Sequence, residues 1–372
     1  LRRHPRGEPG GGCNLGGDVF SFLMRYENLE FSEALKVLAE KAGVELRSIA
    51  SGDYKFTGLL YDINHAARDF FRSALSRSEA AQRYLAERKL AAATIEEFEL
   101  GWAPNQPDAL NLHLLDKGFY LEDVLRAGLA VKSDRGLQSD RFRGRVMFPI
   151  HNSFGKVVGF TGRVLPSVEK GVEGADFTPA KYVNSPETPI FNKSKLLYGL
   201  WKSKNFIREE KAAFLVEGQM DFLMSYQAGV KHAVASSGTA LTPHHLQALK
   251  RLTDELLISF DADEAGWAAG ERAIDLAEAS DFNVRVVLLR GFKDPADAVA
   301  ADPKALADAI VNAAPAMEFY FARYLPKEVS RDATAREHLR SIRAVLTKIK
   351  NIASAVARSA WIKELAKRTG TE

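Results

Sequence analysis

The sequence predicts an α/β protein in which a mainly parallel sheet follows a mixed α+β region and precedes a helical one. From Ala212 onwards, short apolar segments that read as strands alternate with amphipathic helical segments. This alternation is typical of a parallel sheet covered by helices on both faces. Before it the periodicity is first helical and then β-like, and from residue 299 it is helical again. The 372 residues are enough for two or three compact units.

The composition excludes several classes of protein. Hydrophobic residues make up 46% and charged residues 27% of the chain, which are ordinary values for a globular protein. The formal net charge of +3 neither requires nor excludes a nucleic-acid partner. No apolar run approaches the roughly 18 residues of a membrane span. The single cysteine, Cys13, fits a reducing cytoplasm, and a chain that begins at Leu1 rather than Met reads as a fragment.

The first half of the chain reads as helices followed by a hairpin. GDVFSFLMRYENL and FSEALKVLAEKAG show helical spacing, and the polar stretch from Arg47 to Gly58 has the composition of a linker. A helical pattern extends from Leu59 to about Leu129. RVMFPIH and KVVGFTGRV, joined by the turn NSFG, then predict a β-hairpin.

Four segments of the second half predict strands: AAFLVE, HAVASS, ELLISFD and NVRVVLL. The helical segments between them are MDFLMSYQAG, TPHHLQALKRL and AGWAAGERAIDLAEAS. Because the strands are short and apolar and helices connect them, we expect them to lie parallel in one sheet.

Carboxylates follow three of these strands. Glu217 ends the first strand and is followed by Asp221. Asp261 ends the third strand, and Asp263 lies two positions later. Asp294 follows the fourth strand. Ligands of an open parallel sheet gather beyond the carboxyl ends of its strands, and residues i and i+2 of an extended segment face the same side. Oxygen ligands without His or Cys suit Mg²⁺ or Mn²⁺. The DADEAG segment alone favours a simple helix cap at Asp263, whereas the whole set favours a metal site.

A basic interval lies between Arg141 and Arg163. It holds five Lys or Arg residues and no Asp or Glu, with Phe142, Phe148 and Phe160 between them. Cations on a hairpin can follow a nucleic-acid backbone, and Arg pairs with phosphate in a bidentate manner. The alternative is a solvated positive face with aromatic residues in the core; the absence of acids shifts the interpretation towards binding.

These motifs together resemble the bacterial DnaG-type primases with their TOPRIM domain. The resemblance extends from about Gly12 to Asp297 and rests on the order and spacing of GCNLGGDVFSFLM, DRFRGRVMFPI, GFTGRV, KYVNSPETPIFNKSKLLYGL, VEGQMD, SSGTALT, FDADEAG and KDP. It implies a remnant of a zinc-binding domain at 1–46, a linker at 47–58, an α+β N-terminal core subdomain with the basic hairpin at 59–205, a Rossmann-like TOPRIM domain at 206–298 and a helical subdomain at 299–372.

The resemblance implies a DNA primase, a DNA-directed RNA polymerase that makes short RNA primers on single-stranded DNA by Mg²⁺-dependent nucleotidyl transfer. It makes Glu217, Asp261 and Asp263 the catalytic metal ligands, with Asp221 and Asp294 in support. It assigns the surface for template, NTPs and RNA primer to the following residues: Arg88, Arg141, Arg163, Lys181, Asn184 and Lys193. In YLAERKL, Lys89 stands where the family usually has glycine.

Two departures from the family limit the expected partners. Zn²⁺ is expected for the family, whose zinc-binding domain supplies three Cys and one His, but only Cys13 matches here and the site is incomplete. The chain stops at Glu372, before the family's helicase-binding domain, so the replicative helicase is an expected partner of the parent protein. A single-stranded DNA-binding protein is a further candidate partner and no membrane is expected. The implied location is the cytoplasm, at the nucleoid and replisome.

Two other functions remain open from the sequence. A TOPRIM nuclease or topoisomerase-like enzyme uses similar acids, although none of the tyrosines lies in a recognisable setting for a topoisomerase nucleophile. A non-catalytic DNA-binding module of the replisome is the other, and the intact acids count against it because a carboxylate cluster hinders the binding of a polyanion.

Overall fold

The computed structural model describes residues 17–27, 31–44, 51–133, 136–165, 179–261, 263–325, 335–352 and 354–370. The chain divides into two compact units, Leu1–Ser51 and Gly52–Glu372. In the part of the chain that the structure describes, no helix is both long and apolar enough to cross a membrane.

The first unit contains a pair of short helices, α1 (Val19–Glu27) and α2 (Phe31–Ala42). Leu23 and Ala34 are buried where the two helices pack. Gly43 follows α2 with φ +64°, a left-handed conformation that commonly ends helices. The helix pair predicted from the sequence is therefore confirmed. Cys13 lies outside the described residues.

The second unit begins with an α+β part. Its helices are α3 (Ser51–Ser76), α4 (Glu79–Glu87), α5 (Ala92–Glu97), α6 (Ala109–Asp116) and α7 (Leu121–Arg126). Its strands are β1 (Gly101–Ala103), β2 (Ala130–Lys132), β3 (Gln138–Asp140), β4 (Arg145–His151), β5 (Val157–Val164) and β6 (Tyr182–Asn184). Four of the strands form an antiparallel sheet in the order β1-β4-β5-β6, and β2 and β3 pair separately.

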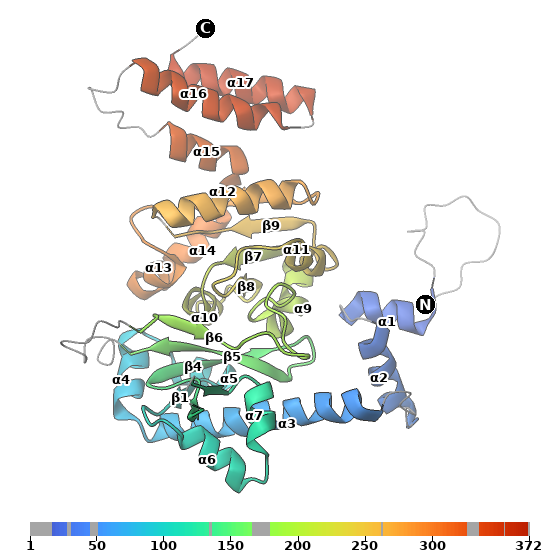
Figure 1. Ribbon diagram of the computed structural model, residues 1–372. Helices are drawn as coiled ribbons and strands as arrows, with labels where there is room; N and C mark the ends of the chain where they lie inside the picture. The colour runs from blue at the N-terminus through green and yellow to red at the C-terminus, as the bar shows by residue number, and fades with distance from the viewer. Residues whose placement is uncertain are drawn as a thin grey trace, which may run out of the picture. The chain divides into compact units, whose positions relative to one another are not determined.

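The hairpin predicted from the sequence is confirmed as β4 and β5. Its turn is closed by Asn152, whose side-chain Oδ1 accepts from the backbone N–H groups of Phe154 at 3.0 Å and Lys156 at 3.1 Å. Every residue of β4 is buried, because both faces of the sheet are covered. α3 packs on one face, with the rings of Phe71 and Phe160 5.3 Å apart (Figure 1).

The predicted linker differs from the structure over its second half. Ser51 to Gly58 are helical and form the beginning of α3. Their polar composition resembles that of a linker, but the helix they begin buries Leu60, Ile63 and Ala67 along one face. Tertiary packing of such a face stabilises a helix beyond the local preference of its first turns.

The second part of the unit is built on a five-stranded sheet. Its strands are β7 (Ala212–Val216), β8 (Ala233–Ala235), β9 (Glu255–Ile258), β10 (Asn283–Val286) and β11 (Ala314–Pro315). They lie in the order β11-β10-β9-β7-β8, and all are parallel except β11. All four predicted strands are present, so the predicted α/β class is confirmed. The chain leaves β7 towards β8 on one side and returns to β9 on the other, which creates a switch point between β7 and β9.

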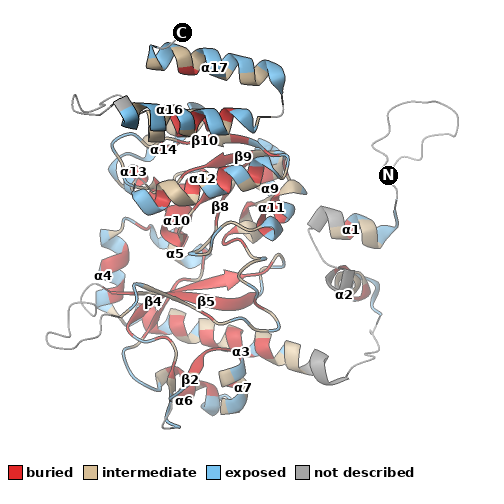
Figure 2. Cartoon of the chain, turned by 45° about the horizontal axis from the view of Figure 1, so that its top comes forward, coloured by how far each residue is buried: buried red, intermediate tan, exposed pale blue. Residues whose placement is uncertain are grey.

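Helices cover both faces of this sheet (Figure 1). They are α9 (Leu200–Glu210), α10 (Gln219–Gln227), α11 (Pro243–Lys250), α12 (Glu264–Glu278), α13 (Pro295–Ala301) and α14 (Pro303–Val311). Alternate residues of β7 point into two hydrophobic clusters, with Phe214 in one and Leu215 in the other. The cluster that contains Phe214 also contains Phe148 of β4, so the two sheets share one core (Figure 2).

The last helices, α15 (Ala316–Tyr324), α16 (Ala335–Lys350) and α17 (Ala355–Thr369), follow the sheet. α16 packs against α15 through Val345 and Ile349, which are buried in the second cluster with Tyr320. Lys348 Nζ lies 2.9 Å from Glu271 and 2.6 Å from Asp275, both on α12. The helical end predicted for the chain is confirmed.

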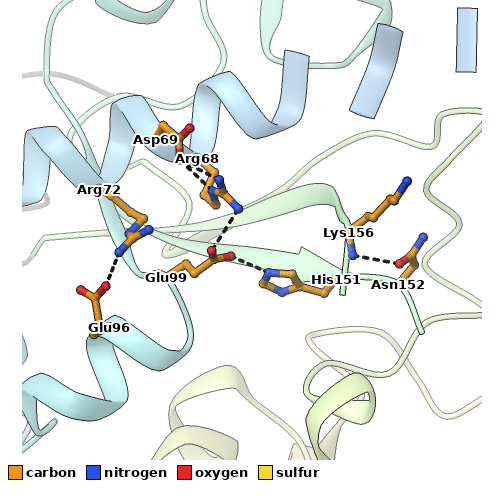
Figure 3. A network of polar contacts seen from close by, with 8 residues as sticks. All are labelled: Arg68, Asp69, Arg72, Glu96, Glu99, His151, Asn152 and Lys156. Carbon is orange, nitrogen blue, oxygen red and sulfur yellow. Dashed lines mark hydrogen bonds and ion pairs between the residues drawn. The ribbon is translucent and has the colours of Figure 1, made fainter. Parts of the chain in front are cut away.

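A polar network holds α3, β4 and the segment before β1 together (Figure 3). Glu99 accepts from Arg68 Nη1 at 3.0 Å and from His151 Nε2 at 2.8 Å. The His151 side chain is only 2% exposed, and its ring stacks on Trp201. Burial disfavours the Glu99 carboxylate, but the His151 hydrogen bond and the Arg68 charge outweigh it and lower the pKa of Glu99.

Glu99→Gln should destabilise the protein by about 1–3 kcal/mol at pH 7, because the amide can satisfy only one of the two donors. Because the pKa of Glu99 is lower in the folded state than its ordinary value of 4.5, its contribution to the free energy of unfolding is complete above pH 4.5. This contribution is lost as the pH falls through the folded-state pKa. Denaturant unfolding at several pH values should show wild type and variant converging in acid. Glu96→Gln, in the exposed pair with Arg72, is the control with little effect. A pH-independent difference would contradict this role for Glu99.

Candidate active site

Two carboxylates lie side by side at the switch point of the parallel sheet. Glu217 directly follows β7, and Asp261 follows β9, the neighbouring strand. The Asp261 backbone N–H donates to Glu217 Oε1 at 3.1 Å, so the two segments are joined by a direct hydrogen bond. The sheet therefore brings together residues that are 44 positions apart in the sequence.

Two further carboxylates reach the same place from helix N-termini. Asp221, in the first turn of α10, is buried and accepts from the backbone N–H groups of Gly218 and Ala296, each at 3.2 Å. Asp294 caps α13 by accepting from the Asp297 backbone N–H at 2.7 Å. α10 and α13 pack against each other, and this contact fixes the separation of the two side chains.

These four carboxylates line one wall of a pocket of about 500 Å³. The opposite wall comes from the α+β part of the unit and carries Arg88, Arg163, Lys181 and Asn184. The pocket therefore lies between the two sheets, with most of its carboxylates on one side and most of its cations on the other; Glu87 and Lys293 are the exceptions. An arrangement of this kind can hold a phosphate between bound cations and guanidinium groups.

Burial and mutual repulsion raise the pKa of three of the carboxyl groups. Burial, followed by the charges of Asp294 and Asp261, raises the pKa of Asp221 to about 7. Burial, followed by the charges of Glu217 and Asp294, raises the pKa of Asp261 to about 6. The pKa of Glu217 is raised chiefly by burial, with Asp263 and Asp294 adding to it. Without cations, ionisation of all these carboxyl groups costs free energy, because they are buried and their charges repel one another.

Asp263 caps a helix, which is the alternative that the DADEAG segment alone favours. Its Oδ1 accepts from the Gly266 backbone N–H at 2.8 Å and caps α12, and the residue does not line the pocket. The first N–H groups of a helix need acceptors, and the chain enters α12 here instead of continuing as a strand. The charge of Asp263 still reaches Glu217, whose pKa it helps to raise.

The donor set of the pocket fits a hard divalent cation. Its lining holds carboxylates but neither His nor Cys, and oxygen ligands of this kind suit Mg²⁺ or Mn²⁺. Across the described residues, no group of three His, Cys, Asp or Glu side chains is close enough to hold an ion as the side chains stand.

Arg163 is held by two aromatic rings at the pocket wall. Its guanidinium carbon lies 5.5 Å from the ring centre of Tyr84 and 5.1 Å from that of Tyr182. Its Nη1 also donates to the Tyr182 hydroxyl at 2.7 Å. The two rings and the hydrogen bond together hold the guanidinium at the pocket wall. Neither tyrosine belongs to a sequence motif that points to this role.

A chain of polar side chains joins the two walls. Gln219 Nε2 donates to Thr161 Oγ1 at 2.8 Å and to Ser237 Oγ, and Thr161 Oγ1 donates to Asn184 Oδ1 at 2.7 Å. Asn184 Nδ2 in turn donates to the Ser237 carbonyl at 3.4 Å. Gln219, Thr161 and Ser237 were missed as site residues, although VEGQMD, GFTGRV and SSGTALT contain them.

The remaining predicted residues lie at different places. Arg88 and Lys181 line the pocket, and Arg88 precedes Lys89, whose φ of +58° is a conformation that favours glycine. Arg141 is half-buried behind Asn184, to whose carbonyl its Nε donates at 3.3 Å, and burial lowers its pKa. Lys193 does not line the pocket. Cys13 lies outside the described residues.

Three family models match the chain. Residues 70–204 match "DNA primase catalytic core, N-terminal domain", residues 214–299 match "Toprim-like" and residues 11–53 match "CHC2 zinc finger". The first two meet at the pocket, because one supplies its cationic wall and the other its carboxylates.

Named proteins agree with these models. The DNA primase of Deinococcus radiodurans is 41% identical over 292 residues, which are 78% of this chain and 49% of that protein. The chain spans about half the length of the curated relatives it matches.

Among solved structures, the RNA polymerase domain of Mycobacterium tuberculosis primase DnaG matches with a TM-score of 0.71 and 33% identity, over 83% of this chain and 98% of that domain. A DnaG primase catalytic domain bound to single-stranded DNA matches with a TM-score of 0.66 and 32% identity, over 84% and 99%. The resemblance inferred from the motifs is thereby confirmed, and the chain belongs to the DnaG-type primase family.

Proposed function

We propose that this chain is the catalytic core of a DNA primase, which synthesises short RNA primers on single-stranded DNA by Mg²⁺-dependent nucleotidyl transfer. The observation that carries the proposal is the pocket in which Glu217, Asp221, Asp261 and Asp294 face Arg88, Arg163 and Lys181. Phosphoryl and nucleotidyl transfer depend on positioning and on compensation of charge, and this pocket has groups for both. Family membership supports the same activity.

Glu217, Asp261 and Asp263 would hold divalent cations, with Asp221 and Asp294 in support. When bound, Mg²⁺ would compensate phosphate charge and make a ribose 3′-hydroxyl a better nucleophile. The backbone N–H groups of Gly218 and Ala296 keep Asp221 oriented towards the pocket while its neighbours repel it. The hydrogen bond from Asp261 N–H keeps Glu217 beside the β9 end.

The cationic wall would bind the phosphates of template, NTP and primer. Arg163 is suited to this because its two flanking tyrosines hold the guanidinium in one orientation. Asn184, fixed by Thr161 and Ser237, can orient a sugar or phosphate oxygen at the same wall. That a related DnaG catalytic domain has been solved with single-stranded DNA supports the assignment of the template.

Other family properties concern the larger protein. A four-ligand zinc site does not fit the cysteines of this sequence, since Cys13 is the only one, and no step is assigned to Zn²⁺. We expect the helicase and a single-stranded DNA-binding protein to be partners of the parent protein, at the replisome in the cytoplasm. The division into domains at residues 47, 59, 206 and 299 likewise remains a prediction.

Asp261→Asn should reduce primer synthesis at least about 100-fold, because it removes a charge that the cations require. Single-strand binding should persist, since the cationic wall is intact. A second readout is thermal unfolding: added Mg²⁺ should raise the Tm of wild type and not that of the variant. The assay contains template, NTPs and Mg²⁺, and is read for both RNA products and cut DNA. DNA cleavage without RNA synthesis by wild type would overturn the proposal in favour of a nuclease.

Asp263→Asn is the matched variant, because asparagine caps a helix as well as aspartate does. The cap uses Oδ1, so the free energy of unfolding without metal should stay within about 1 kcal/mol of the wild-type value. Loss of synthesis would then identify Asp263 as a metal ligand, as we propose. Full activity would show that this residue only caps α12.

Arg163→Gln should weaken binding of single-stranded DNA about tenfold and lower the slope of log K against log salt by about 0.7, the value of one phosphate contact. Fluorescence anisotropy at several salt concentrations measures both quantities. Lys117→Gln, an exposed cation at the end of α6 that does not line the pocket, is the control. Equal losses in both variants would remove Arg163 from the binding wall.

A further inference from the structure

Helix α16 carries a row of cations that the pocket does not use. Arg336, Arg340, Arg343 and Lys350 follow one another at intervals of four, three and seven residues, which place them on one face of a helix. All four are exposed, and in the described part of the chain none of them forms an ion pair. Thr347 completes the same face, so no acid interrupts it. We call these four cations the α16 stripe.

The opposite face of α16 is anchored to the sheet part of the unit. Val345 and Ile349 are buried, and Lys348 is engaged by Glu271 and Asp275 of α12. The cations that stabilise the fold are therefore on one side of the helix, and those of the stripe are on the other. Figure 2 shows exposed residues along the length of α16. The stripe is thus presented on a fixed support.

Charge is concentrated at this end of the chain. Residues 335–370 contain nine Lys or Arg and two Glu, a net charge of +7, whereas the whole chain carries +3. The other residues together are therefore acidic by four charges. A strongly basic hairpin on an acidic body is an electrostatic surface for a polyanion.

We propose that the α16 stripe binds the phosphate backbone of a nucleic acid outside the pocket, as a second contact with template or product. A helix rises 1.5 Å per residue, so the stripe extends over about 21 Å, along which a duplex presents about twelve phosphate charges. Such binding is independent of sequence and depends strongly on salt. The binding of a nucleic acid by the stripe is argued from its charge and exposure. Only the assignment of that nucleic acid as template or product rests on the proposed function.

The test is Arg340→Gln/Arg343→Gln, compared with Lys363→Gln/Lys367→Gln on α17. Each double variant removes two exposed cations one turn apart, so their net charges are equal. Affinity for labelled single-stranded DNA and for an RNA–DNA hybrid is measured between about 50 and 200 mM salt. The stripe variant should bind at least one of them about tenfold more weakly, with a slope reduced by about one to two. The nucleic acid whose binding is weakened more is the one that the stripe contacts.

Arg340→Lys/Arg343→Lys keeps the charges and should restore the slope, which excludes a mere folding defect. Binding that is unchanged in the stripe variant would overturn the proposal and leave the stripe to a protein partner. Equal losses from the α17 variant would also overturn it, because the effect would then come from overall charge. Primer synthesis is assayed in parallel. A wild-type protein that binds nucleic acid but makes no RNA would refute the proposed activity. The binding data would still decide whether the stripe contacts nucleic acid.

Discussion

Mutual repulsion among four carboxylates is the constraint on which the rest of this structure depends. Glu217, Asp221, Asp261 and Asp294 converge because parallel strands end at the same edge and two helices begin there. The raised pKa values of Glu217, Asp221 and Asp261 reflect the cost of placing carboxylates together in a buried site without cations. The large shared core has to supply the stability that this arrangement loses. A cluster of carboxylates favours the binding of cations, and a negatively charged substrate is favoured only once cations compensate the charge.

The opposite wall is fixed to the carboxylates by packing and by hydrogen bonds. Phe148 of the hairpin and Phe222 of α10 belong to one hydrophobic cluster, so the two sheets cannot separate without exposing it. Gln219, Thr161 and Asn184 then link the walls at the pocket itself. Packing and these hydrogen bonds together set the distance between cations and carboxylates. Positioning of this kind is what transfer of a nucleotide needs from a protein.

The elements with a strong pattern were predictable from the sequence, and those set by tertiary context were not. The hairpin and the strands after residue 212 follow from apolar runs between turn residues. That Glu217 and Asp261 meet follows from parallel strands alone. The DADEAG segment alone indicates the cap at Asp263, whereas the whole set of acids favours a metal site; the position of the side chain depends on where α12 begins, to within one or two residues. The roles of Tyr84 and Tyr182 beside Arg163 depend on contacts between distant segments, which no local pattern carries.

The most direct test of the central claim is diffraction from crystals of this chain with Mn²⁺, recorded for its anomalous signal. The account predicts a peak bound at about 2.0–2.6 Å to carboxylate oxygens of both Glu217 and Asp261. The side chains should move together around it, since they do not converge as they stand. Mn²⁺ found only at other carboxylates, with this pocket empty and its side chains unmoved, would contradict the account.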